Sequence, residues 1–137
     1  MIYIFDASFA GSLIIPDEKN HKAEKARALI GEDEDVFAPQ LIWYEMASIF
    51  RNLIRRNRYS YNEVLQLFPL FNAIRLTTDY ETGTHYSQKL LRLCNDCKLS
   101  AYDAAYLELA ERKNATLCTL DDGLIAAAKK RGVPVLK

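Results

Sequence analysis

Four acidic residues occupy positions from which their side chains could act together. Asp6 follows the apolar run 2–5, and Asp121 follows the apolar run 116–118. Glu45 lies inside an otherwise apolar stretch, and Asp103 lies near the start of a helical pattern. Each has an ordinary structural explanation, because Asp is common at helix N-termini and a boundary Glu can pair with an arginine. No single acid therefore predicts chemistry.

The case for a shared site rests on the four carboxylates in combination. Two carboxylates about 6 Å apart repel by roughly 3 kcal/mol at an effective dielectric constant near 20. Several such pairs would cost a large part of a domain's ~5–15 kcal/mol of stability. A divalent cation removes that cost, and oxygen ligands suit Mg²⁺ or Mn²⁺. The residues favour metal-dependent chemistry on phosphoesters and leave open whether Asp121 or Asp122 takes part.

Short apolar segments alternate with helical patterns along the chain. We expect strands at 2–5, 36–38, 74–76, 116–119 and 133–136, and helices at 7–15, 20–31, 39–56, 60–71, 80–97, 100–112 and 122–131. This alternation predicts one α/β domain over residues 1–137, a three-layer α/β/α sandwich with a mainly parallel sheet of about five strands. Because sites in such sheets form at the carboxyl ends of strands, Asp6 and Asp121 should lie at one edge.

Local signals set several of these boundaries. Asn20 could cap the second helix and Gly31 could end it, while Pro39 stands where the third could begin. The pattern Ser60-x-x-Glu63 is a capping box. Gly132 is a stop signal after the last helix, and Pro134 suggests that the final strand is an edge strand.

The composition describes a folded, neutral protein. Half of the residues are hydrophobic and the formal net charge is zero, so the overall balance does not favour a nucleic-acid binder. The start resembles no signal peptide, no apolar run approaches the ~20 residues of a membrane helix, and the cysteines are odd in number, so we expect a cytoplasmic protein with free thiols. Cys94 and Cys97 are taken as two helical residues rather than zinc ligands, because a second ligand pair is missing.

Two further features concern binding surfaces. Arg51, Arg55 and Arg58 are spaced for one helical face and could contact RNA phosphates or an acidic partner segment, or could form a solvated helix end. Four aromatic residues could pack at a dimer or antitoxin interface, although a plain core role is favoured for any single one: Tyr59, Tyr61, Phe68 and Phe71.

Over nearly its whole length the sequence resembles a PIN domain, and within that family the VapC-type toxins of toxin–antitoxin pairs. The resemblance is carried by Ile4–Ser8, by 39–45 with Ala47, by 99–107 with Ala110 and Glu111, and by 117–121 with Leu124, Gly132 and Val133. It implies one site formed by Asp6, Glu45, Asp103 and Asp121, and chooses Asp121 over Asp122 because Thr119-x-Asp121 matches the family spacing. Ser8 and Thr119 match hydroxyl positions that support the site.

The resemblance also implies an activity and partners. It implies an endoribonuclease that hydrolyses RNA phosphodiester bonds with water activated by Mg²⁺ or Mn²⁺, a homodimer, and a cognate antitoxin. Ser100 and Tyr102 flank Asp103, and helix capping and packing account for them.

The alternative to a ribonuclease is a PIN-like module that binds RNA or protein without catalysis. An aspartyl-nucleophile phosphatase would need a second acid where Ser8 stands, and a phospho-receiver domain would need its acidic pair near the first strand.

Overall fold

The computed structural model describes residues 1–18, 21–29, 31 and 33–137. Its strands are β1 (Ile2–Phe5), β2 (Asp35–Pro39), β3 (Thr77–Asp79) and β4 (Thr116–Cys118). Its helices are α1 (Ala7–Ile14), α2 (His21–Leu29), α3 (Ile42–Arg55), α4 (Tyr61–Leu65), α5 (Phe68–Ala73), α6 (Thr84–Cys97), α7 (Ala101–Lys113) and α8 (Asp122–Lys130). The predicted cap Asn20 lies outside the described residues. None of the described helices is long and apolar enough to cross a membrane.

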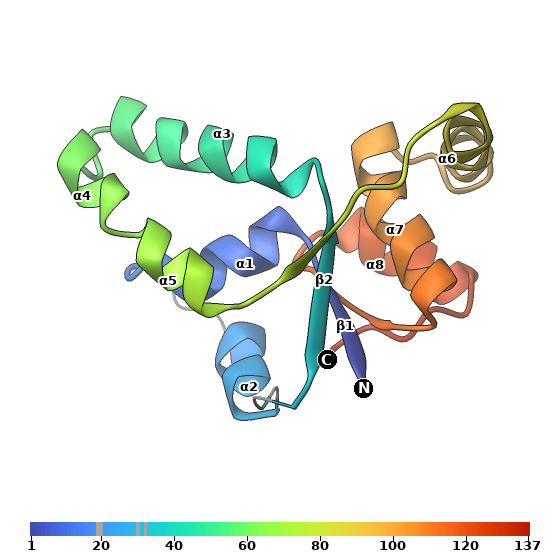
Figure 1. Ribbon diagram of the computed structural model, residues 1–137, viewed down its shortest axis with the longest axis horizontal. Coiled ribbons are helices and arrows are strands. Elements are labelled where there is room, and N and C mark those ends of the chain that lie inside the picture. Colours follow the sequence, from blue (N-terminus) through green and yellow to red (C-terminus); the bar gives the residue numbers. More distant parts are fainter. Residues whose placement is uncertain (19–20, 30, 32) are drawn as a thin grey trace.

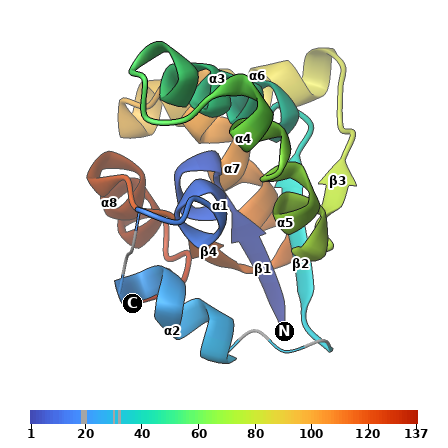
Figure 2. The ribbon, with the colours of Figure 1, turned by 90° about the vertical axis from the view of Figure 1, so that its left-hand side faces the viewer.

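The four strands form one parallel sheet in the order β3-β2-β1-β4. Helices α1, α3, α4 and α5 lie on one side of it and α6, α7 and α8 on the other (Figures 1 and 2). The inner strand β1 contributes to two apolar clusters. Ile4 belongs to the larger one, which includes residues of α1, α3 and α7, while Tyr3 and Phe5 pack with Phe9 of α1. The predicted three-layer α/β/α class is therefore confirmed.

Two predicted helices differ from the structure for local reasons. Pro39 ends β2 rather than beginning a helix, and α3 starts at Ile42. The helix expected at 60–71 is divided into α4 and α5, because Pro69 has no N–H for the carbonyl of Leu65 and lies in the first turn of α5 instead. The Ser60–Glu63 capping box at the start of α4 is present.

The third and fifth strands differ from the segments that the apolar runs predict. The third was expected at 74–76 but is Thr77–Asp79, a partly exposed edge strand that pairs with 37–39. The fifth reduces to one bridge between Leu117 and Val135, because Pro134 cannot donate to a ladder. Gly132 ends the last helical segment with a φ of +74°, a conformation that glycine adopts without strain.

Candidate active site

Asp6 connects β1 to α1 and is almost fully buried. As the N-cap of α1 it accepts a hydrogen bond from the Phe9 backbone N–H at 2.8 Å and one from the Ser8 hydroxyl at 2.8 Å. Its second oxygen accepts from the hydroxyl of Thr119. Burial raises the pKa of Asp6 and outweighs these hydrogen bonds, and the negative charge of Asp103 raises it further. Capping a helix and belonging to an acidic cluster are thus compatible roles.

Thr119 connects Asp6 to Asp121. It is fully buried, and while its hydroxyl donates to Asp6 its oxygen accepts from the Asp121 backbone N–H at 3.0 Å. The Asp121 carboxylate caps α8 by accepting from the Leu124 N–H at 2.7 Å. Asp122 is the exposed first residue of α8. One buried hydroxyl therefore fixes the relative position of two of the four acids.

Glu45 and Asp103 lie in the first turns of α3 and α7. Glu45 is partly buried and accepts a 2.6 Å hydrogen bond from the Tyr106 hydroxyl, not from the arginine considered above. Burial raises the pKa of Glu45, and the charges of Asp6 and Asp103 add to that effect. Burial and the charge of Asp121 raise the pKa of Asp103, whose backbone N–H is capped by Ser100.

The four acids form one electrostatically coupled group. Asp103 influences Asp6 and Glu45, and Asp121 influences Asp103, although the acids come from four separate segments. None of the ion pairs found among the described residues includes any of them. The described part of the chain also holds no three His, Cys, Asp or Glu side chains close enough together to bind one ion as they stand. The group is therefore an acidic cluster, beside which the Lys22 ammonium donates to the Thr119 backbone carbonyl at 3.4 Å.

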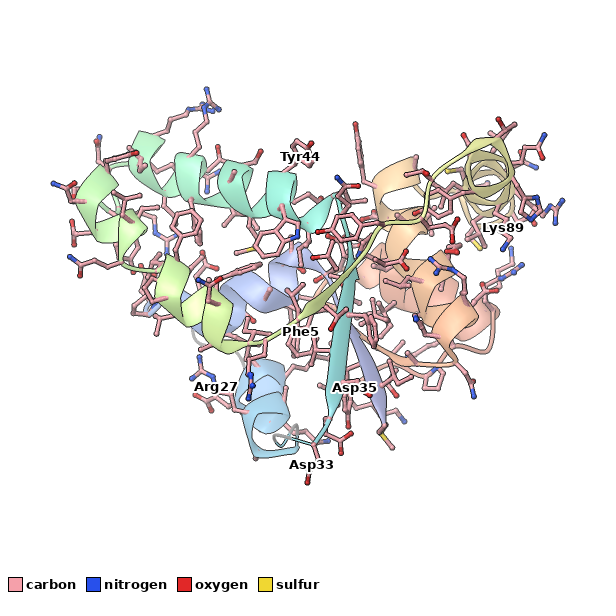
Figure 3. The ribbon with its side chains drawn as sticks, in the orientation of Figure 1. Phe5, Arg27, Asp33, Asp35, Tyr44 and Lys89 are labelled. Atoms are coloured by element: carbon pink, nitrogen blue, oxygen red, sulfur yellow. The ribbon has the colours of Figure 1, made fainter. Side chains whose placement is uncertain are left out.

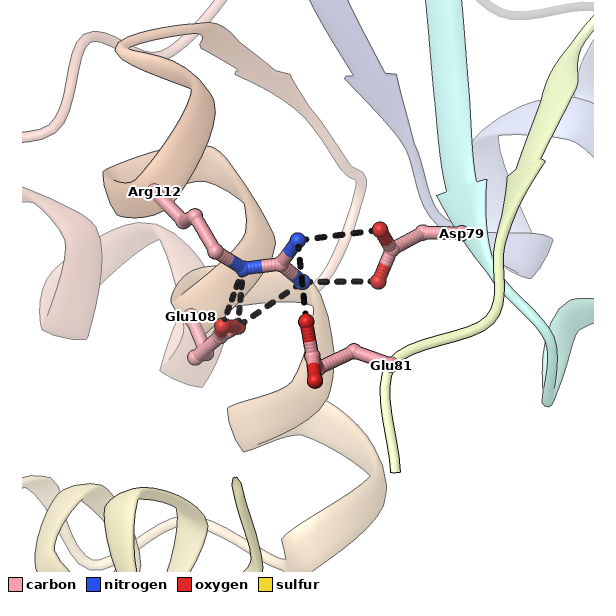
Figure 4. Close-up of polar contacts among 4 residues, drawn as sticks. All are labelled: Asp79, Glu81, Glu108 and Arg112. Carbon is pink, nitrogen blue, oxygen red and sulfur yellow. Dashed lines mark hydrogen bonds and ion pairs between the residues drawn. The ribbon is translucent and has the colours of Figure 1, made fainter. Parts of the chain in front are cut away.

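A second acidic cluster on the far half of α7 is organised differently (Figure 4). Arg112 forms a two-point ion pair with Asp79, at 2.9 and 2.7 Å, and a 2.6 Å contact with the buried Glu108. Glu81 approaches the same guanidinium at 3.9 Å. Arg112 lowers the pKa of Asp79, the opposite direction to the shift at Asp6. This cluster ties the end of β3 to α7.

Two predictions about exposed residues need correction. Arg58 does not share a helical face with Arg51 and Arg55, because α3 ends at Arg55 and Arg58 pairs with Asp17 and Glu18 at 2.7 and 3.1 Å. The core role favoured for Phe71 is confirmed, since 3% of its surface is exposed. Packing does not explain Tyr102, which is 67% exposed, whereas Ser100 does cap α7.

One site feature was not assigned from the sequence. Tyr106 was recognised only as part of the family pattern, yet its hydroxyl holds Glu45; its position three residues after Asp103, on the same side of a helix, was the available signal. The C-x-x-C residues lie together in α6 as free thiols, as expected.

Comparison with known proteins identifies the family. A family model described as the PIN domain matches residues 3–130, so the chain belongs to the PIN-domain family. The chain is 29% identical over 126 residues to Ribonuclease VapC3 of Pyrobaculum aerophilum, covering 88% of this chain and 90% of the relative.

Solved structures share the fold. PAE2754 from Pyrobaculum aerophilum superposes with a TM-score of 0.70 at 22% identity, over 99% of this chain and 92% of that one. A chain of a toxin–antitoxin complex from Klebsiella pneumoniae gives a TM-score of 0.61 at 16% identity, over 98% and 96% of the two chains. At these identities the likeness concerns the fold alone.

Proposed function

We propose that this protein is a divalent-metal-dependent endoribonuclease that hydrolyses RNA phosphodiester bonds, and that it is the toxin of a toxin–antitoxin pair. The observation that carries the proposal is the gathering of Asp6, Glu45, Asp103 and Asp121 at the carboxyl edge of the sheet without an ion-pair partner among the described residues. Membership of the PIN-domain family and the name of the VapC3 relative support the choice of RNA.

The donor set fits a hard divalent cation. All four side chains offer carboxylate oxygens, the ligands that Mg²⁺ and Mn²⁺ prefer. Asp6 retains capacity for a further contact, because a carboxylate can accept about four hydrogen bonds and three are present. Burial and neighbouring carboxylates raise the pKa values of Asp6, Glu45 and Asp103, and a bound cation would offset the charge of these three groups. Since no three acids lie at ligand spacing, binding would draw these side chains closer together.

The chain's own residues would hold and orient this site. Thr119 and Ser8 fix Asp6, and Tyr106 fixes Glu45. The bound ion would lower the pKa of water and offset charge that develops on the phosphoryl group. The exposed Arg51 and Arg55 would contact RNA phosphates or an acidic antitoxin segment. We further propose a homodimer, with exposed Tyr61 and Phe68 available for an interface.

Asn substitutions at two of the acids test the proposed activity. Asp6→Asn and Asp103→Asn keep the size of the side chain and remove its charge, so each should abolish RNA cleavage in Mg²⁺ or Mn²⁺ while circular dichroism and melting show a folded protein. Asp122→Asn is the matched control, because Asp122 is an exposed neighbour outside the proposed ligand set. Undiminished cleavage by both variants would contradict the metal-nuclease proposal and favour a non-catalytic binding module.

A further inference from the structure

Three exposed tyrosines follow or begin elements at the carboxyl edge of the sheet. Tyr44, Tyr80 and Tyr102 are 72%, 67% and 67% exposed. No hydrogen bond of their hydroxyls, and no contact of their rings with another ring or a cation, is present in the described part of the chain. Figure 3 shows Tyr44 pointing outward from α3. Exposure of three large aromatic side chains at one edge calls for an external partner.

Two of these tyrosines directly precede proposed catalytic acids in the sequence, whereas Tyr80 follows Asp79 of the second cluster. Tyr44 precedes Glu45 in the first turn of α3, and Tyr102 precedes Asp103 in the first turn of α7. The hydrogen bond from Tyr106 to Glu45 holds these two helix starts together. Tyr102 lies four residues before Tyr106, one helical turn further toward the open end of the cluster.

Tyr80 belongs to the same edge through a different element. It directly follows Asp79, the last residue of β3, and β3 runs parallel to β2. The Gln40 N–H donates to the Asp79 carbonyl at 3.1 Å, and the Trp43 indole N–H donates to the Thr78 hydroxyl at 2.9 Å. These two contacts keep the end of β3 against the start of α3. All three tyrosines therefore stand on segments that meet at the carboxyl edge of the sheet.

The composition of this rim distinguishes it from the other exposed apolar surface. Along α4 and α5 the exposed apolar side chains mix aliphatic and aromatic types: Tyr61, Leu65, Phe68 and Leu70. Around the acids they are tyrosines and the partly covered Trp43. A mixed apolar surface suits packing against protein side chains, whereas separate aromatic rings around a polar centre suit flat ligands such as nucleobases.

We propose that Tyr44, Tyr80 and Tyr102 are base-stacking residues that hold unpaired nucleotides on either side of the bond to be cut. This inference rests on the proposed ribonuclease function and assigns the residues that hold the nucleotides beside the bond to be cut. The acidic cluster repels phosphates in the absence of a cation, so contacts to the bases would add binding energy next to the acids, beyond what Arg51 and Arg55 would supply. Bases inside a duplex are already stacked on one another and cannot splay onto tyrosine rings.

Binding of RNA to tyrosine variants tests this proposal. The probe is a fluorescently labelled, mixed-sequence, single-stranded oligoribonucleotide of about ten nucleotides, since stacking tolerates every base. Binding is measured by anisotropy in the Asp103→Asn protein with EDTA, which reduces the negative charge of the site and prevents metal-dependent cleavage. Tyr44→Ala, Tyr80→Ala and Tyr102→Ala should each raise the Kd about 10-fold. Tyr44→Phe and Tyr102→Phe, which keep the ring, should restore binding.

The matched control is Leu91→Ala, which removes an equally exposed large apolar side chain from α6 and should leave the Kd within twofold of the parent value. A duplex of the same length should bind more weakly than the single strand. The proposal is overturned if the alanine variants bind the single strand like the parent, or if Leu91→Ala weakens binding equally. It is also overturned if sedimentation shows that Tyr44→Ala or Tyr102→Ala changes the oligomeric state while RNA binding is retained.

Cleavage by the unmodified protein separates this inference from the function on which it rests. If that protein cleaves no RNA in Mg²⁺ or Mn²⁺, the proposed function fails whatever the binding data show. If it does cleave, Tyr44→Ala and Tyr102→Ala should raise KM for short single strands about 10-fold and change kcat less. Cleavage with unchanged KM in both variants would overturn the stacking role alone.

Discussion

The two ends of α7 carry acidic clusters with opposite electrostatics. Toward its N-terminus, Asp103 joins Asp6 and Glu45, whose pKa values are raised by burial and by one another. Toward its C-terminus, Glu108 shares Arg112 with Asp79, whose pKa is lowered. Each cluster draws its acids from several segments. The guanidinium at one end makes that cluster a structural connection, and the lack of one at the other leaves an unbalanced charge that a cation could neutralise.

The largest expected effect comes from placing a cation in the acidic cluster. Glu45→Lys would put an ammonium beside Asp6 and Asp103, which would imitate the Arg112 arrangement. Cleavage should fall on the order of 1,000-fold, about 4 kcal/mol of transition-state stabilisation, because the ammonium would replace the metal ion. The free energy of unfolding without metal should not fall. Single-turnover cleavage assays and urea unfolding measure both quantities.

Glu45→Gln serves as the control, since it removes a charge without adding a cation. It should weaken cleavage but leave measurable binding of Mn²⁺ by calorimetry, whereas Glu45→Lys should abolish that binding. Retention of full activity in Glu45→Lys would show that the two clusters do not differ in the way described.

Removing the guanidinium should have the next largest effect, on stability rather than activity. Arg112→Met leaves Glu108 buried and Asp79 unpaired, which should cost on the order of 3 kcal/mol of unfolding free energy. Arg131→Met is the matched control: its ion pair with Glu111 is more exposed, so the loss should be within about 1 kcal/mol. Equal losses in the two variants, measured by urea unfolding, would count against a special role for the Arg112 cluster.

A smaller effect is expected from the hydroxyl that connects two of the acids. Thr119→Val removes the donor to Asp6 and the acceptor for the Asp121 N–H, so cleavage should fall about 10- to 100-fold. Thr116→Val changes a less buried threonine two residues before the end of β4 and should have little effect on cleavage. If Thr119→Val cleaves RNA as fast as the parent protein, Thr119 has no part in holding the site.

The smallest effect is the pH dependence of stability in EDTA, which should have opposite signs for the two clusters. A raised carboxyl pKa contributes stability below the ordinary value, 3.8 for Asp6, and loses it as pH rises through the folded-state pKa. The lowered pKa of Asp79 contributes stability above 3.8 and loses it as pH falls. Unfolding free energies of the parent, Asp6→Asn and Asp79→Asn measured across this range give the two slopes. Slopes of one sign at both positions would refute the comparison.

The sequence contained strong signals for the elements that depend on near neighbours. The apolar run 2–5, the Ser60–Glu63 capping box and Gly132 placed element boundaries correctly, because capping and backbone freedom are local properties. The edge strand Thr77–Asp79 was missed because it is partly exposed and lacks an apolar pattern. Arg58 was misassigned because the end of α3 and its partners Asp17 and Glu18 depend on a contact across 40 residues.

For the acidic site, the residue types and their places at the ends of elements could be inferred from the sequence, since strand ends and helix starts are local. The tertiary structure decided how the acids are held. In the folded chain Thr119 is hydrogen-bonded to both Asp6 and Asp121. Glu45 accepts a hydrogen bond from Tyr106 rather than from an arginine, and Arg112 pairs with Asp79 in the other cluster. These outcomes depend on which segments pack side by side, and that pairing is a property of the folded sheet rather than of any stretch of sequence.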